Sequence, residues 1–246
     1  MIQEILKTWQ ENSSDMTDTE TQRYVCKYCD KSYRKESTLA AHLCEPKRRY
    51  QQEKEQGVQM GFQAYLRFYE LTQGSANLKT YTHLVESPYY NAFVKYGRHC
   101  QSVRCVNFKS YTDWLLKNNK KLDHWCKEDH YVEWLSQYLR NESVQDALER
   151  SIREIQRYAD ETDSLQDVDY FRYGNANKIC YHISNGRVSA WVVFNCDSGI
   201  EFLERLNEDQ LKVVLPWIDP EFWQRKFQDY LADREWVREI LKQGGF

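Results

Sequence analysis

The sequence is poor in proline and glycine, the two residues that most often interrupt helices. It contains four prolines and nine glycines among 246 residues, and a proline inside a helix removes a backbone donor and clashes with the preceding turn. It also contains no apolar run as long as a membrane span, which takes about 20 residues. These absences favour long helices and predict a protein without a membrane partner.

Common catalytic motifs are missing as well. The sequence has no P-loop, no glycine-rich dinucleotide turn, no HExxH and no convincing pair of catalytic carboxylates. A cysteine and a serine occur in Asn195–Gly199, but nucleophilic catalysis also needs an oriented base. We therefore predict a protein that is not an enzyme. An enzyme that uses Cys180, His182 or Asp197 is the alternative.

The composition indicates a packed globular protein in a reducing compartment. Aromatic residues make up 15% of the chain, with eight tryptophans and eighteen tyrosines, whereas disordered chains contain few. Eight cysteines without a signal peptide are expected to be reduced thiols. The length suffices for a sizeable core in one or two domains.

Positive charge is concentrated in one part of the chain. The formal net charge is −3, so the whole protein is not a basic nucleic-acid binder. Residues 21–54, however, hold nine Lys or Arg against four Asp or Glu, a balance of +5 that leaves −8 for the remainder. Any contact with nucleic acid is therefore expected from this segment.

The same segment contains a metal-ligand pattern, Cys26-x2-Cys29-x3-Tyr33-x5-Leu39-x2-His42. This is the spacing of a ββα zinc finger, with two cysteines on a short hairpin and a histidine on a helix. A module this small cannot bury enough surface to fold alone, so the metal supplies the missing stability. The pattern predicts one structural Zn²⁺.

The fourth ligand departs from the usual finger, because the next candidate is Cys44, two residues after His42. On a continuing helix, residues two apart point to nearly opposite faces. The helix is therefore expected to end between these two residues, and Pro46 supports this by disfavouring a helical Glu45. Water, or a distant cysteine or histidine, is the alternative fourth ligand.

The finger offers a nucleic acid only weak sequence readout. Lys35, Thr38 and Ala41 occupy the positions that contact bases in a Cys2His2 finger. An alanine offers only a methyl group and a threonine reads weakly, so we expect non-specific contacts. The residues predicted to contact nucleic acid are Arg34, Lys35, Thr38, Lys47, Arg48 and Arg49.

The predicted fold is mainly α, a small N-terminal ββα zinc finger joined by a basic helix to an irregular multi-helix body. The expected parts are an acidic N-terminal segment and linker (1–22), the finger (23–46), a connecting helix (47–74) and a helical body (75–246). Met16 is an alternative start. Expected helix starts are Ser87-Pro88, Ser143, Asn175 or Asn177, Ser198, Asn207 and Asp219-Pro220. Arg187–Asn195 is strand-like, but a buried helix fits equally well.

Two further clusters have a chemical and a structural interpretation. His124–His130 contains two histidines and a cysteine at workable ligand spacing, but lies beside an apolar stripe where cysteine acts as a small hydrophobe. Phe171–Asn185, with Arg172, Lys178 and His182, could line a pocket. We favour the structural interpretation for both, the second as an ordinary turn and helix.

Three runs, YVCKYCDKSYRKESTLAAHLCEPKRRYQ, SPYYNAFVKYGRHC and RYGNANKICYHISNGRVSAW, resemble a zinc-finger protein family of contractile-tailed bacteriophages that infect marine cyanobacteria. The resemblance covers most of the chain from about Met16. It implies a phage-encoded protein that acts in the cytoplasm of the infected bacterium or is carried in the virion, and it implies no activity. The finger also resembles the Cys2His2 zinc finger, from which it departs at Cys44.

These observations together predict a zinc-binding protein that contacts nucleic acid non-specifically through its finger and basic helix start. The helical body would dock a protein partner from the phage or host machinery. The alternative is a structural or assembly protein of the virion, in which the finger is a protein-docking knob. Salt-dependent nucleic-acid binding distinguishes the two.

Overall fold

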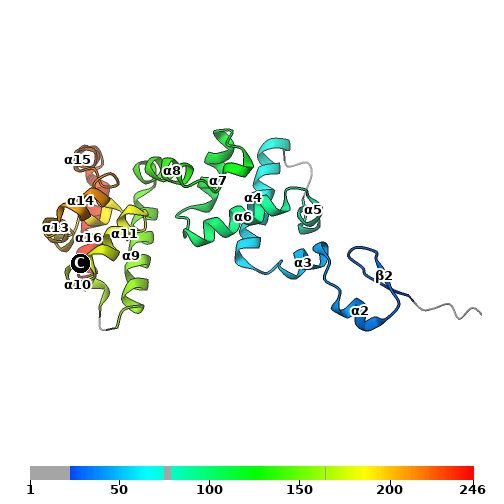
Figure 1. Cartoon of the computed structure of the whole chain (residues 1–246). Helices are drawn as coiled ribbons and strands as arrows, with labels where there is room; N and C mark the ends of the chain where they lie inside the picture. The colour runs from blue at the N-terminus through cyan, green and yellow to red at the C-terminus, as the bar shows by residue number, and fades with distance from the viewer. Residues whose placement is uncertain (1–22, 75–78, 164) are drawn as a thin grey trace, which may run out of the picture. The chain divides into compact units, whose positions relative to one another are not determined.

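The computed structural model describes residues 23–74, 79–163 and 165–246, and it is mainly α-helical (Figure 1). Over these ranges, fifteen α-helices and two 3-10 helices accompany one two-stranded hairpin. The expected fold class is confirmed. The predicted acidic segment 1–22, with Met16, lies outside the described residues.

The described part of the chain forms two compact units, residues 23–101 and 102–246. The division falls after Gln101, and not after Gly74, where the sequence suggested that a separate body begins. Over the described residues, the first unit therefore contains the finger together with two helices of the expected body, residues 81–86 and 90–102.

The finger is a hairpin followed by one short helix. Strand β1 (Tyr24–Val25) pairs antiparallel with β2 (Ser32–Tyr33), and Tyr24 lies opposite Tyr33. Helix α2 (Glu36–Ala41) follows directly. The expected ββα order is present, although α2 has only six residues.

The expected single connecting helix is wrong, because the segment forms two helices, α3 (Glu45–Gln51) and α4 (Gln56–Gln73). The break comes at Glu55, whose extended backbone (φ −65°, ψ 131°) caps α4. Residues 52–55 are polar and none of them is buried, so no buried apolar face keeps a helix continuous there. Gly74 ends α4 in a positive-φ conformation (77°), as expected of a glycine stop.

Helix α5 (Tyr81–Glu86) packs on α4, and α6 (Tyr90–Ser102) approaches α4 at glycines. A Cβ atom at Gly97 of α6 would lie 2.1 Å from the carbonyl oxygen of Gly57 and 2.3 Å from the amide nitrogen of Gly61. The two helix backbones can approach this closely only because all three positions lack a side chain.

In the second unit, the helices after residue 166 gather beside the longer α9 (Figure 1). The elements of this unit are α7 (Phe108–Lys117), the 3-10 helix η1 (Leu122–His124), α8 (Glu128–Asn141), α9 (Val144–Asp160), the 3-10 helix η2 (Asp167–Asp169), α10 (Tyr170–Tyr173), α11 (Ala176–Ser184), α12 (Ala190–Val193), α13 (Asp197–Glu204), α14 (Glu208–Val214), α15 (Pro220–Asp229) and α16 (Leu231–Gln243).

Most predicted helix starts are confirmed by side-chain caps. An oxygen of the capping side chain accepts a backbone N–H in the first turn of α9, α11, α14 and α15. The capping residues are Ser143, Asn175, Asn207 and Asp219. Ser87 likewise accepts the Tyr89 N–H (3.1 Å) before α6.

The predicted helix start at Ser198 is wrong, and the structure decides between strand and helix for Arg187–Asn195. Ser198 does not cap a helix, because α13 already begins at Asp197. Within Arg187–Asn195 the chain forms the short helix α12, whose residues are all buried. A continuous apolar run carries no periodicity that could separate a strand from such a helix.

Aromatic side chains fill the core of the second unit. Trp191 lies against Trp223 and Phe227, with ring centroids 5.9 Å and 5.0 Å away. Helix α9 packs against α12 and α16 around this centre. Such rings bury large areas and fix their neighbours by edge and tilted contacts, so this unit has a core independent of any metal.

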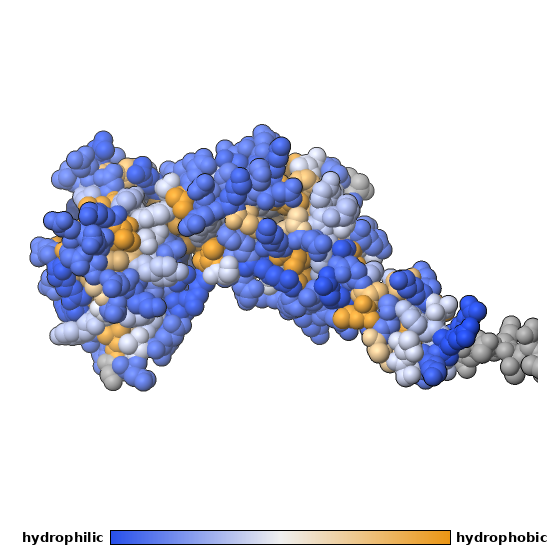
Figure 2. Space-filling model, viewed as in Figure 1, coloured by the Kyte–Doolittle hydropathy of each residue, from blue (hydrophilic) through white to orange (hydrophobic). Residues whose placement is uncertain are grey.

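On the face shown in Figure 2, hydrophilic residues cover most of the surface of each unit, and apolar residues form small separate areas. In the part of the chain that the structure describes, no helix combines the length and the apolar character that crossing a membrane requires.

Candidate metal centre

The hairpin turn presents Cys26 and Cys29 to one point. The Cys26 carbonyl accepts N–H groups from Cys29 (3.4 Å) and Asp30 (2.8 Å), which curls the chain back on itself. Asp30 completes the turn with a positive φ of 56°, a conformation that aspartate adopts more readily than most residues. The Cys26 N–H then donates to the Lys31 carbonyl at 2.9 Å and rejoins the hairpin.

His42 and Cys44 reach the same point because the backbone between them is extended. Helix α2 ends at Ala41, and both His42 (ψ 124°) and Cys44 (ψ 163°) have extended conformations. Residues two apart in extended chain lie on the same face. The helix thus ends one residue earlier than expected, with the same consequence for the two ligands.

The predicted role of Pro46 is wrong. Glu45 is helical, as the first residue of α3, and Pro46 lies in the first turn of that helix. Proline is tolerated there because a first-turn amide has no intrahelical acceptor. Cys44 is therefore extended as the residue that precedes a new helix, and not because proline disrupts the old one.

The four side chains converge tightly enough to hold one metal ion. The ligand atoms of Cys26, Cys29, His42 and Cys44 all lie within 4.8 Å of one another. The Cys26 and Cys44 sulfurs are 3.8 Å apart, and the Cys29 sulfur is 3.3 Å from Nε2 of His42. With a zinc–sulfur bond near 2.3 Å, two thiolates of a tetrahedral site lie about 3.8 Å apart. The donor types and spacings therefore fit a closed structural site.

Without a bound cation, the pKa values of two thiols in this cluster shift in opposite directions. A hydrogen bond from the Tyr28 backbone lowers the pKa of Cys26. The Lys31 backbone acts in the same sense on Cys29, but desolvation and the neighbouring thiols of Cys44 and Cys26 outweigh it, so the pKa of Cys29 is raised. A divalent cation removes this conflict, because it binds thiolates directly.

Surrounding contacts hold the ligands in place. The Tyr33 and His42 rings lie 4.9 Å apart, which positions the imidazole against the finger core. The Lys47 ammonium donates to the His42 carbonyl at 2.9 Å. Cys26 is 3% exposed, so the centre is closed on its hairpin side.

The candidate nucleic-acid residues fall into two groups with different surroundings. Arg34, Lys35 and Thr38 are exposed at the start of α2. Lys47 and Arg49 instead have intramolecular partners. Arg49 donates to the Val85 carbonyl (2.5 Å), and its guanidinium lies 4.4 Å from the Tyr90 ring centroid.

Arg48 is exposed but paired, since its guanidinium donates to Glu45 at 2.6 Å. The basic start of α3 therefore contributes first to the packing of the first unit. Arg34 and Lys35 are the members of the predicted set whose side chains remain most available to a ligand.

The other candidate clusters take different forms. Within the described ranges, the only group of three or more metal-ligating side chains is the one in the finger, so His124–His130 does not form a second centre there. Cys180 and Cys196 are 3% and 6% exposed, and burial raises the pKa of both thiols. Asp197 is exposed. These thiols lack the ionised character of a nucleophile.

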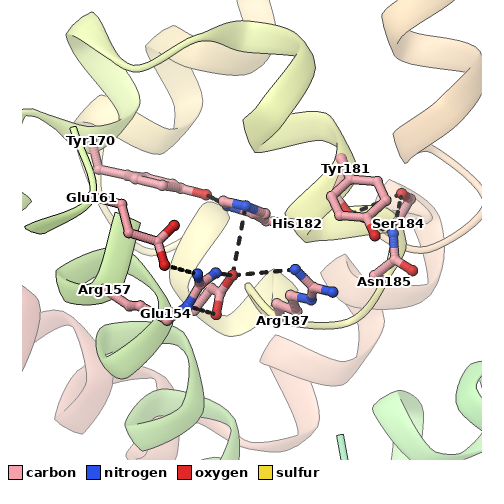
Figure 3. A network of polar contacts seen from close by, with 9 residues as sticks. All are labelled: Glu154, Arg157, Glu161, Tyr170, Tyr181, His182, Ser184, Asn185 and Arg187. Carbon is pink, nitrogen blue, oxygen red and sulfur yellow. Dashed lines mark hydrogen bonds and ion pairs between the residues drawn. The ribbon is translucent and has the colours of Figure 1, made fainter. Parts of the chain in front are cut away.

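Sequence reasoning missed a buried polar network around His182 (Figure 3). Glu154 lies 3.6 Å from both His182 Nε2 and Arg187 Nη1, and it accepts from Arg157 Nε at 3.0 Å. The spacing of Glu154 and Arg157 on a helix looks like an ordinary solvated ion pair, so only tertiary structure reveals the network.

Comparisons with protein-family models, with curated proteins and with solved structures find no match to this chain. The metal centre is therefore defined by the positions and donor chemistry of its own four residues.

Proposed function

We propose that this protein is a zinc-dependent, non-enzymatic nucleic-acid-binding protein whose finger meets the phosphate backbone without sequence preference. Zn²⁺ is the proposed ion, because three thiolates and one imidazole are a common donor set of structural zinc sites. The zinc fixes the hairpin relative to α2, and so holds the surface side chains of both in one arrangement.

The observation that carries the proposal is the exposed charge around the metal centre. Residues 23–44 contain five basic side chains, all exposed, against two acidic ones. The five are Arg23, Lys27, Lys31, Arg34 and Lys35. Cations grouped on a small rigid module release counterions from a phosphate backbone when they bind it.

The short helix argues against sequence-specific reading. Helix α2 has six residues, and the helix positions that would face bases include Thr38 and Ala41. Neither side chain can make a bidentate contact with a base edge. Binding is therefore expected to depend on charge and salt, with little preference between sequences.

The experiment is a salt titration of the zinc-loaded full chain with labelled duplex and single-stranded DNA and RNA, read by fluorescence anisotropy. Contacts with three or four phosphates predict a log–log salt slope of about −3 on duplex DNA. The Arg34→Glu/Lys35→Glu variant should weaken binding at least about tenfold and reduce the slope by about two.

The matched control is Lys212→Glu/Arg238→Glu, which makes the same charge change at exposed positions of the second unit. It should leave both affinity and slope close to those of the unmodified chain. Zinc-loaded protein that binds none of the four nucleic acids at about 50 mM salt would reject the proposal.

A protein-docking knob is the second candidate, favoured by two exposed apolar side chains on the finger. Val25 is 54% exposed and Leu43 is 59% exposed. Exposed apolar groups beside a rigid module suit a protein surface better than a phosphate backbone. Under this alternative Val25→Ser/Leu43→Ser would abolish partner binding, and Arg34→Glu/Lys35→Glu would not.

The helical body supplies a partner surface under either candidate. Tyr173 and Trp236 are 76% and 44% exposed, and aromatic side chains are enriched where proteins meet. The resemblance to phage proteins supports a role in the cytoplasm of an infected bacterium, with a position in the virion as the alternative. A partner from phage or host machinery follows from that setting.

A further inference from the structure

The second unit contains a pocket of about 580 Å³ whose walls come mainly from α9 and α11. Four of its lining side chains are cationic, and Glu161 is its acidic one. The cations are Arg104, Arg157, Lys178 and Arg187. Glu154 lies outside the lining, but even when its charge is counted the four cations outnumber the two carboxylates. A cleft with a net positive charge attracts anions.

Arg187 is the deepest of these cations and has donors to spare. The residue is 8% exposed, and its nearest acidic contact is Glu154, 3.6 Å from Nη1. That separation exceeds a hydrogen bond. Its Nε is buried without a hydrogen-bond partner in the part of the chain that the structure describes. A guanidinium carries five N–H donors, so this side chain is incompletely satisfied as it stands.

Arg157, unlike Arg187, forms close ion pairs with two carboxylates. It donates to Glu154 through Nε (3.0 Å) and to Glu161 through Nη1 (2.5 Å), and Figure 3 shows it between these two carboxylates. Arg157 therefore shapes the wall, and Arg187 lies on the other side of Glu154 (Figure 3). Glu154 also faces Arg187 at 3.6 Å. Among the described residues, Lys178 and Arg104 are therefore the pocket cations without an acidic partner, and Arg187 adds an unused N–H donor.

Lys178 and Arg104 form the exposed rim. Neither pairs with an acidic side chain among the residues that the structure describes. Lys178 lies in the first turn of α11, where Asn175 caps the helix and also lines the pocket. The positive end of the α11 dipole therefore adds to the same field.

The floor of the pocket is polar but uncharged. His182 is 4% exposed, and its Nδ1 lies 2.8 Å from the Tyr170 hydroxyl while its Nε2 faces Glu154. Burial raises the pKa of Tyr170, so the hydroxyl keeps its proton and donates to Nδ1. The imidazole then directs its Nε2–H toward the Glu154 carboxylate, 3.6 Å away.

We propose that this pocket binds a phosphoryl group of a small anionic molecule, with Arg187, Lys178 and Arg104 as its cationic contacts. A phosphoryl oxyanion suits this set because it accepts several charge-assisted hydrogen bonds from different directions. The recessed position of Arg187 favours a small molecule over a duplex backbone, which would reach only the rim. This site is separate from the finger and does not rest on the function proposed for it.

The experiment measures inorganic pyrophosphate and inorganic phosphate binding to the zinc-loaded full chain by isothermal titration calorimetry. Pyrophosphate should bind more tightly than phosphate, because it offers more oxyanion acceptors to the same cations. Lys178→Ala and Arg104→Asn should each weaken pyrophosphate binding about tenfold. Asparagine is chosen because Arg104 has a φ of 49°, which asparagine tolerates.

Both rim residues are exposed, so the two variants are expected to fold, and thermal unfolding confirms this before titration. Lys212→Ala, an exposed lysine of α14 outside the pocket, is the matched control and should bind as the unmodified chain does. Arg187→Lys tests the recessed contact, since it keeps the charge and loses the planar fork; it too should weaken binding.

Three results would overturn the proposal. The first is no pyrophosphate binding at millimolar concentration. The second is equal binding by the rim variants and the control. The third is a short single-stranded oligonucleotide that binds through Lys178 and Arg104 while pyrophosphate does not, which would assign the rim to a nucleic-acid backbone.

Discussion

The sulfurs of Cys26 and Cys44 lie 3.8 Å apart although the two cysteines are 18 positions apart in the chain. That separation matches the edge between two thiolates of a tetrahedral zinc site, about 3.8 Å. It arises because Cys26 lies in the hairpin turn, and because the extended backbone after α2 places the side chain of Cys44 on the same side as that of His42. The departure from a second histidine therefore preserves the ligand geometry of a finger.

We predict that Cys44→Ala weakens zinc retention as much as His42→Ala does. Each removes one of four convergent ligands, and the loss should reach at least about a hundredfold, because even residues that merely support ligands cost ten- to a hundredfold. The measurement is competition with a chromophoric chelator. Cys105→Ala, a cysteine outside the cluster, should retain zinc fully. Retention by Cys44→Ala, together with loss by His42→Ala, would exclude Cys44 as a ligand.

Removal of the metal should unfold the finger and leave most of the helical structure intact. The finger contributes only the six residues of α2 to the helices, whereas the second unit has its own aromatic core around Trp191 and Trp223. A chelator should therefore change far-ultraviolet circular dichroism little, while new protease cleavage appears within residues 23–44. Collapse of the whole helical signal on zinc removal would contradict this.

Local chemistry made part of the fold predictable from the sequence. A helix start depends on a side-chain oxygen and backbone amides a few residues away, so Ser143 and Asn207 could be recognised without tertiary information. The metal ligands were predictable for the same reason, since their spacing is local. The end of α2 before His42 was harder to predict, because a helix of six residues has too little apolar periodicity to define where it ends.

Other features depend on partners distant in sequence. The close approach of Gly97 to Gly57 and Gly61 is invisible until α4 and α6 are packed together. Likewise Arg49 looks like a free cation in the sequence, but the fold provides it with the Val85 carbonyl and the Tyr90 ring. Tertiary contacts of this kind decide which charges remain available to a ligand.

The Gly97 contact predicts a large effect from a single methyl group. Gly97→Ala would place a Cβ 2.1 Å from the Gly57 carbonyl oxygen, so α4 and α6 must separate. Overpacking of this type costs roughly 1–3 kcal/mol, which urea unfolding should detect. Gly244→Ala is the control, because its Cβ would meet no atom nearer than 3.3 Å. Equal stability of the two variants would show that the helices do not pack at this distance.

A buried ion pair in the second unit predicts that removing one partner alone destabilises the protein more than replacing both. Glu142, whose side chain is 0% exposed, receives two hydrogen bonds from Arg150, one of them 2.7 Å long. Burial raises the pKa of Glu142, and Arg150 is its compensating charge. Arg150→Met should therefore destabilise the protein by about 3–5 kcal/mol, the usual result of leaving a buried charge unpaired.

Two comparisons test that interpretation by urea unfolding. Arg153→Met removes an exposed arginine from the same helix and should change stability by less than about 0.5 kcal/mol. The double variant Glu142→Gln/Arg150→Met should recover part of the loss, because no uncompensated carboxylate remains. A double variant less stable than Arg150→Met would contradict the argument.

His182 predicts a pH dependence of stability in a defined window. Burial, together with the positive charges of Arg187, Arg157 and Lys178, lowers its pKa from 6.5 to about 4, although Glu154 opposes this. Between these two pH values the unfolded chain binds a proton that the folded protein does not. Stability from this group is therefore complete above about pH 6.5 and falls as the pH drops toward about 4.

The loss should amount to roughly 3 kcal/mol over that window, measured as the difference in free energy of unfolding between the unmodified chain and His182→Gln. The amide cannot take up the proton, so the variant should show a flatter profile from pH 6.5 to pH 4. Contributions from zinc release and from His130, whose pKa burial also lowers, are common to both proteins and cancel. Glu154, with a lowered pKa, acts mainly below pH 4.5. Parallel profiles for the two proteins between pH 6.5 and 4.5 would show that His182 is not held neutral in the folded state.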